Sequence, residues 1–129
     1  MKQNLLLTVA SLLSILLMTF HLSDDVVRGI EPGGIKNMIG IIILVIWLYG
    51  TLVLAGRRSG YIIILLGSIL GAGIPIVHMT GAGLVGDKIV AFGGVFFFVW
   101  TLLALGVTAS FSLLLSAQAF WKLQKRRVE

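Results

Sequence analysis

The two histidines of the chain are the residues best suited to chemistry, and each stands at the end of an apolar stretch. His21 is followed by Asp24 and Asp25, and His78 closes a second apolar stretch much further along the chain. Asp25 lies four residues after His21, so a continuous helix would carry both side chains on one face. Imidazole nitrogens and carboxylate oxygens are ligands of Zn²⁺, Mn²⁺ and Fe²⁺. These residues therefore form a candidate divalent-metal site of His21, Asp25 and His78.

Two other interpretations of the same residues stay open. The one we favour is structural: His21 and Asp25 cap a helix end and hydrogen-bond to His78 or to loop backbone. The other is a b-type haem held between the two histidines, which needs the rings to oppose each other across the macrocycle. We disfavour haem because the spacing gives no sign of that arrangement. Beside a metal ion, Asp24 or Glu31 would be the candidate general base.

The elements that carry these residues belong in a membrane. Of the 129 residues, 58% are hydrophobic and 12% are charged, and the mean hydropathy is +1.08. A soluble domain carries about 25% charged residues, so this chain lacks the polar surface for a water-facing exterior. It has no cysteine, which excludes disulfides, thiolate metal sites and iron–sulfur clusters. We therefore expect an integral membrane protein.

Four charge-free hydrophobic stretches each come near the length of about 20 residues that crosses a bilayer as a helix. None alternates with the period of two that a membrane β-strand needs. No small-x-small cleavage site follows the first stretch, so we expect it to be a retained helix. The sequence predicts an all-α, integral membrane four-helix bundle, with spans at about 4–22, 37–56, 60–79 and 90–119 and a basic tail at 122–129.

The basic residues predict the orientation of the spans. With four spans both termini lie on one side, and seven of the ten Lys and Arg residues fall there. Because cytoplasmic loops carry the excess of Lys and Arg, we expect an inner-membrane protein with both termini in the cytoplasm. A short inner hairpin turn at Gly56–Gly60 would join the second and third helices. The outer loops would then be 23–36 and 80–88, with both histidines at the outer face.

Small residues recur at helical spacing in three of the spans. In lipid, helices associate where small side chains let their backbones approach closely. We expect these faces to pack inside one bundle or to support self-association. Trp47 falls mid-span, and we expect it to pack inward and find a partner for its indole N–H. The faces comprise Gly60, Gly67, Gly71, Pro75 and His78 in the third span; Ala104, Thr108, Ser112 and Ser116 in the fourth; and Ser11, Ser14, Met18, His21 and Asp25 in the first.

The basic tail predicts contact with the bilayer surface. Lys122, Lys125, Arg126 and Arg127 follow the last span. Anionic headgroups attract such residues by about 1 kcal/mol per charge near the surface. Once the spans are removed no basic face remains for nucleic acid, which is therefore not an expected partner.

The absence of several motifs from the sequence narrows the classes of function that remain. No Asp, Glu, Lys or Arg lies within the four spans, which argues against a transporter that relays protons. The chain also lacks a nucleophile elbow, a phosphate loop and a His-Glu-x-x-His helix. We favour a non-catalytic role as an accessory, scaffold or oligomeric subunit, with a second copy or a membrane partner protein. The alternatives are a metal-dependent enzyme acting on a lipid-like substrate at the outer face, and a passive oligomeric channel or carrier.

Overall fold

The computed structural model describes residues 2–31, 33–81 and 86–128, and within these ranges the chain is all-helical. Four helices, the second together with the turn before it, are long and apolar enough to cross a membrane. This confirms the predicted helical class and the presence of four helices long and apolar enough to span a membrane. Parts of both predicted outer loops, Pro32 and residues 82–85, lie outside the described residues. The elements are α1 (Leu5–Val27), the 3-10 turn η1 (Ile35–Asn37), α2 (Met38–Leu52), α3 (Arg58–Thr80), α4 (Asp87–Ala91) and α5 (Val95–Lys125).

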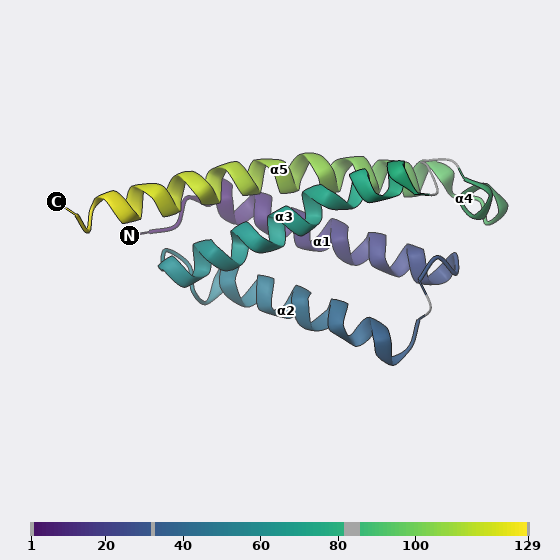
Figure 1. The fold of residues 1–129 in the computed structure, drawn as a ribbon, viewed down its shortest axis with the longest axis horizontal. Coiled ribbons are helices and arrows are strands. Elements are labelled where there is room, and N and C mark those ends of the chain that lie inside the picture. Colours follow the sequence, from purple (N-terminus) through teal and green to yellow (C-terminus); the bar gives the residue numbers. More distant parts are fainter. Residues whose placement is uncertain (1, 32, 82–85, 129) are drawn as a thin grey trace.

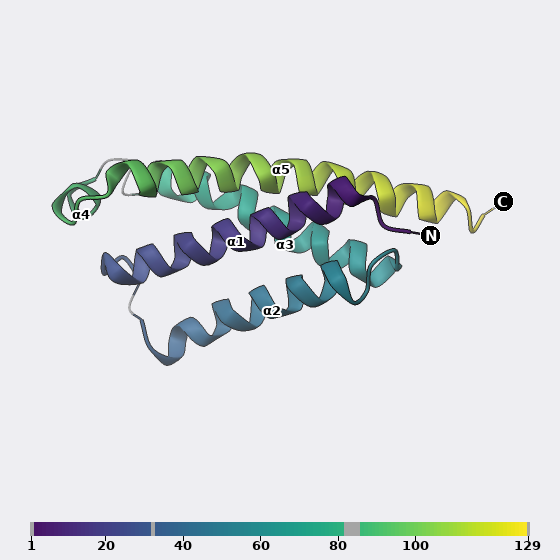
Figure 2. The same ribbon diagram turned by 180° about the vertical axis from the view of Figure 1, so that it is seen from behind.

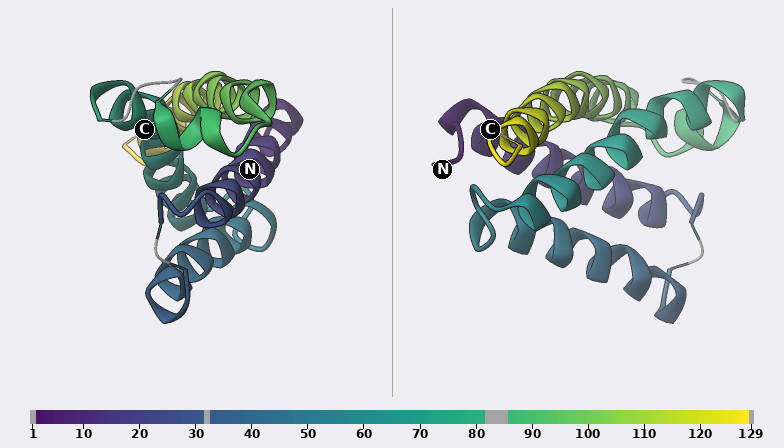
Figure 3. Two further views of the ribbon diagram at one scale, coloured as in Figure 1. Left: turned by 90° about the vertical axis from the view of Figure 1, so that its right-hand side faces the viewer. Right: turned by 60° about the vertical axis from the view of Figure 1, so that its left-hand side comes forward.

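The long helix α5 packs along α3 and α1, and α2 lies on the other side of the bundle against α3 and α1 (Figure 1). The view from behind shows the same order (Figure 2). Both chain ends lie at one end of the bundle, as an even number of spans requires. We call the opposite end, where α1 and α3 finish and α4 lies, the distal end. There α2 stands apart from the other helices (Figure 3).

The first helix is longer than predicted. It continues to Val27, so that Ser23 and both aspartates, which were expected in an outer loop, are helical. The spacing of Asp24 and Arg28 supports this extension, because residues four apart pair on a helix surface. Their side chains do so, with Arg28 Nε 2.7 Å from Asp24 Oδ2. The extension keeps His21 and Asp25 on one helical face.

The other ends of the spans also differ from the prediction. The second helix ends at Leu52, and the connection to α3 folds back so tightly that a Cβ at Gly60 would overlap the Leu54 carbonyl oxygen. The last hydrophobic run is broken at Gly93 and Gly94, whose φ angles of 69° and 61° favour glycine. Beyond the break α5 continues to Lys125, so the first part of the basic tail is helical.

Trp47 is the centre of the packing between α2 and the other helices. Its side chain is 1% exposed, and its indole N–H donates to Ser11 Oγ at 3.0 Å, which confirms both expectations for this residue. The ring packs against Gly67, where an added Cβ would overlap the indole. The glycine is therefore required by the close approach of α2 and α3.

The small residues of α3 and α5 meet each other inside the chain. Gly71 faces Ala109, whose Cβ lies 2.9 Å from where a Cβ on Gly71 would stand, and Ser68 Oγ donates to Ser112 Oγ at 2.8 Å. The predicted seam on α5 is rotated slightly. Ala104 and Thr108 are only half-buried, because the fully buried face of this helix runs through Leu105, Ala109, Ser112 and Ser116.

The packing of Trp47 on Gly67 predicts a position-specific effect of alanine. Gly67→Ala should lower the stability by about 1–3 kcal/mol, because an added methyl group overlaps a buried ring. The midpoint of thermal unfolding in a mild detergent measures this. Gly73→Ala is the matched control on the same helix, since a Cβ there meets nothing within 4 Å. Equal effects of the two substitutions would contradict the packing.

Candidate metal centre

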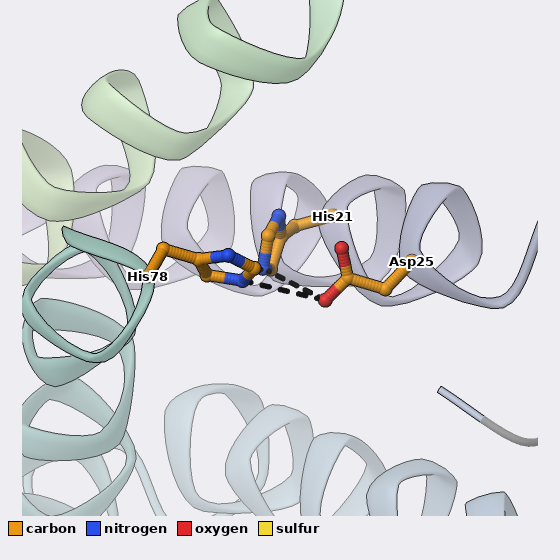
Figure 4. A group of neighbouring side chains, drawn as sticks. All are labelled: His21, Asp25 and His78. Atoms are coloured by element: carbon orange, nitrogen blue, oxygen red, sulfur yellow. Dashed lines mark hydrogen bonds and ion pairs between the residues drawn. The ribbon is translucent and has the colours of Figure 1, made fainter. Parts of the chain in front are cut away.

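His21, Asp25 and His78 meet at the distal end of the bundle, and their donor atoms form a small triangle (Figure 4). The two Nε2 atoms of the histidines lie 3.0 Å apart. Asp25 Oδ2 lies 3.3 Å from His21 Nε2 and 3.5 Å from His78 Nε2. The side chains of His21 and Asp25 are 3% and 8% exposed and that of His78 is 10% exposed. Two helices thus bring the predicted metal ligands together in a nearly water-free place.

Packing around Pro75 sets the position of His78 on α3. Pro75 lies one turn before His78 and is buried. Its ring faces Gly106 of α5, where a Cβ would come within 2.9 Å of Pro75 Cγ. This close crossing of α3 and α5 fixes the last turns of α3, and with them the imidazole, relative to α1.

Arg28 connects the end of α1 to α4 and to Gly94, the residue before α5. Its guanidinium is buried and donates to the Ile89 carbonyl at 2.7 Å and to the Gly94 carbonyl at 3.2 Å, in addition to its bond with Asp24. It also lies over the ring of Phe98, 5.2 Å from its centroid. The bond to Arg28 engages Asp24, and this carboxylate is not one of the three converging donors.

Phe98 packs against both histidines of the centre and is not predicted from the sequence. Its ring is fully buried and its centroid lies 5.7 Å from that of His21 and 5.4 Å from that of His78. No residue pattern singles out Phe98 from the neighbouring phenylalanines. Arg28 could have been found, because it follows Asp24 at the spacing of a helical ion pair.

The triangle of donors has the dimensions of a metal-binding site. With metal–ligand bonds of about 2.0–2.2 Å, two ligands lie about 3.0 Å apart at a right angle and about 3.4 Å apart at a tetrahedral angle. The three observed distances, 3.0, 3.3 and 3.5 Å, fall at or close to these values. Asp25 Oδ1 is buried without a hydrogen-bond partner in the described part of the chain, so it is free to serve as a second oxygen donor.

The ring of His21 is held by packing. Its Nδ1 atom is buried and has no hydrogen-bond partner among the described residues, whereas a metal-binding histidine commonly donates from its second nitrogen. The ring instead stands at 81° to that of His78 and packs against Phe98. The contact with Phe98 therefore takes over the orienting role that a hydrogen bond has in many metal sites.

The arrangement contradicts a haem between the two histidines. Two axial bonds of about 2.0 Å would place the ligating nitrogens about 4 Å apart across the iron. The Nε2 atoms are 3.0 Å apart, and the carboxylate of Asp25 contacts both of them. No room remains for a macrocycle.

A cavity of about 230 Å³ adjoins the centre between α1, α2 and α3. His21, Asp25 and Glu31 contribute its polar lining, and the remainder is apolar and includes Met18 and Trp47. A larger hollow of about 430 Å³ between α3 and α5 has no charged side chain or histidine among its described lining residues. Of these two cavities, the smaller one combines space with ionisable groups among its described lining residues.

Comparison with known proteins found no match: no family model, no curated protein and no solved structure corresponds to this chain. Its function is therefore inferred from the residues of the site.

The contacts of Arg28 predict that its geometry matters as well as its charge. Arg28→Lys should lower the stability by about 1–3 kcal/mol, because one ammonium group cannot reach an aspartate and two backbone carbonyls at once. Thermal unfolding in detergent measures the loss. Arg57→Lys, at an exposed position, should change the midpoint little, and an equal loss in both variants would count against the role of Arg28.

Proposed function

We propose that the protein is a membrane metalloprotein that binds one divalent transition-metal ion through His21, Asp25 and His78. The observation that carries this proposal is the convergence of two imidazole nitrogens and one carboxylate oxygen within 3.5 Å of one another. Two histidines with one carboxylate are the protein ligands of several zinc hydrolases and of non-haem iron(II) centres. Zinc, iron and manganese are accordingly the metals to test.

The proposed centre has the features of a catalytic site. Structural zinc sites are closed by four protein ligands, whereas catalytic sites keep a position open for water or substrate. Three protein ligands leave such a position, and the adjoining cavity is where a further ligand would enter. We therefore propose a metal-dependent enzyme acting on a lipid-like molecule. Glu31 lines the cavity and is the candidate general base, while Asp24 is engaged by Arg28.

The contacts of the small residues weigh against self-association through these faces, one form of the accessory or oligomeric role that the sequence favoured. Gly67 and Gly71 are covered by Trp47 and Ala109 of the same chain. The hydroxyl of Ser112 bonds to Ser68, and that of Ser11 bonds to Trp47 and Thr51. The small residues of these faces thus have their contacts within a single chain. This observation supports neither self-association through these faces nor a channel lined by their hydroxyl groups.

We propose the orientation that the basic residues predict, with both termini in the cytoplasm and the metal centre near the outer surface of the cell membrane. Support comes from the exposed basic side chains at the end that carries both termini, which would contact anionic lipid headgroups. They are Arg57, Arg58, Lys122, Lys125, Arg126 and Arg127.

Metal content tests this function most simply. Untagged protein, purified in mild detergent without chelators, should carry about one equivalent of zinc, iron or manganese by elemental analysis. His78→Ala and Asp25→Asn should each remove it, because both delete a ligand. Asp24→Asn is the matched control and should retain the metal, since that carboxylate bonds to Arg28. Folded wild-type protein that binds none of these metals when supplied with them would overturn the proposal.

Chelation provides a second test, because the same contacts would also exist in a cluster held together by protons alone. A bound ion stabilises the folded state by about 2.7 kcal/mol when its free concentration is a hundred times its dissociation constant. Excess EDTA should therefore lower the unfolding midpoint of the wild type and leave that of His78→Ala unchanged. Equal, small shifts in both proteins would identify a purely hydrogen-bonded His–His–Asp cluster.

A further inference from the structure

The cavity beside the metal centre is polar at one end and apolar at the other. Asp25 and Glu31 line it near the distal end, where α1 finishes. Trp47 and Met18 line it nearer the middle of the bundle. Along α2 the lining extends from Gly40 to Trp47, which is about 10 Å at 1.5 Å per residue. A lipid in the half of a bilayer that surrounds the distal end has the same polarity: its polar group lies at the surface and its chain points toward the middle of the membrane.

The cavity lies beside the part of α2 that is least packed. The buried residues of this helix are Trp47, Gly50 and Thr51, all in its second half. The first half, from Met38 to Ile46, has no buried side chain, and there α2 diverges from the rest of the bundle (Figure 3). A molecule dissolved in the bilayer can therefore reach the cavity beside this half of α2 without crossing water.

The charges around the cavity favour a neutral ligand. Asp25 and Glu31 are the two carboxylates of its lining, and together they balance the charge of a divalent ion. An anionic headgroup would add a negative charge to a balanced and largely apolar site, where unpaired charge is costly. A hydroxyl oxygen can bind the ion while its hydrogen bonds to a carboxylate.

We infer that the cavity binds a neutral lipid with a single apolar chain and a hydroxyl group. The oxygen completes the coordination of the metal ion, and the chain lies along α2 with its far end against Trp47. This inference rests on the proposed metal centre for the polar contact. The apolar contact rests on the lining of the cavity alone, so the two parts can be tested separately.

Trp47 provides the reporter. The chain has three tryptophans, and the other two, Trp100 and Trp121, are exposed. In a Trp100→Phe, Trp121→Phe background, protein in lipid nanodiscs is loaded with zinc and titrated with 8-bromo-1-octanol, whose terminal bromine quenches a tryptophan that it contacts. We expect saturable quenching with the alcohol and only weak, linear quenching with 1-bromooctane, which lacks the oxygen.

A pair of α2 variants tests whether the ligand occupies the cavity. Ile43 lines it, so Ile43→Phe fills part of the space and should raise the half-saturating concentration at least tenfold. Ile42→Phe is the matched control: this neighbour is exposed to lipid and does not line the cavity. The inference would be overturned by quenching that rises linearly with the concentration of the alcohol, or by an equal change of the half-saturating concentration in the two variants.

The metal dependence separates failure of this inference from failure of the proposed function. Zinc content is measured on the same samples. Removal of zinc, or the substitution His78→Ala, should raise the half-saturating concentration of the alcohol at least tenfold. Bound zinc without saturable quenching overturns the ligand inference alone, and protein that takes up no zinc overturns the metal centre. Tighter quenching by 8-bromooctanoate than by the alcohol would contradict the preference for a neutral ligand.

Discussion

In a lipid bilayer a polar side chain finds no water to bind, so the polar groups inside a membrane-spanning bundle need partners within the protein. Trp47, Ser11 and Thr51 join α1 to α2 in this way, and Ser68 with Ser112 joins α3 to α5. Such pairs, together with the glycines that let the helices approach, determine how the four helices face one another. The apolar side chains gain little by leaving the lipid, and many of them remain exposed on the outer surface.

The buried polar groups of the cluster at the distal end also contact one another, but in a different way. The histidines and Asp25 contact one another through only one atom each, and His21 Nδ1 and Asp25 Oδ1 are left without partners in the described part of the chain. Elsewhere in the bundle the buried hydroxyls bond either to another side chain or to a backbone carbonyl of their own helix. Three donors that share one focus have the arrangement that a common cation requires, and the proposed metal centre rests on it. Around them, Phe98 and Arg28 form a shell that connects the site to the beginning of α5.

Much of the fold could be predicted from the sequence, because hydropathy and charge specify membrane helices directly. Helical periodicity also placed His21 and Asp25 on one buried face, and the position of Trp47 in the middle of a span assigned its polar indole to the interior. It could not establish that His21 meets His78, since that contact depends on the rotation and depth of two helices relative to each other. The same limit explains the displaced seam on α5, where Leu105 and Ala109 are buried and Ala104 and Thr108 are half-buried. The extension of α1 depends on Arg28 reaching carbonyl groups more than sixty residues away.

X-ray absorption spectroscopy of the zinc-loaded protein tests whether one metal ion is bound by His21, Asp25 and His78. We expect a first shell of nitrogen and oxygen at about 2.0–2.2 Å, with the outer-shell scattering of two imidazole rings. In His78→Ala the bound zinc, and with it the imidazole scattering, should be lost. A wild-type spectrum of zinc surrounded by oxygen alone, without imidazole scattering, would contradict a centre made of these residues.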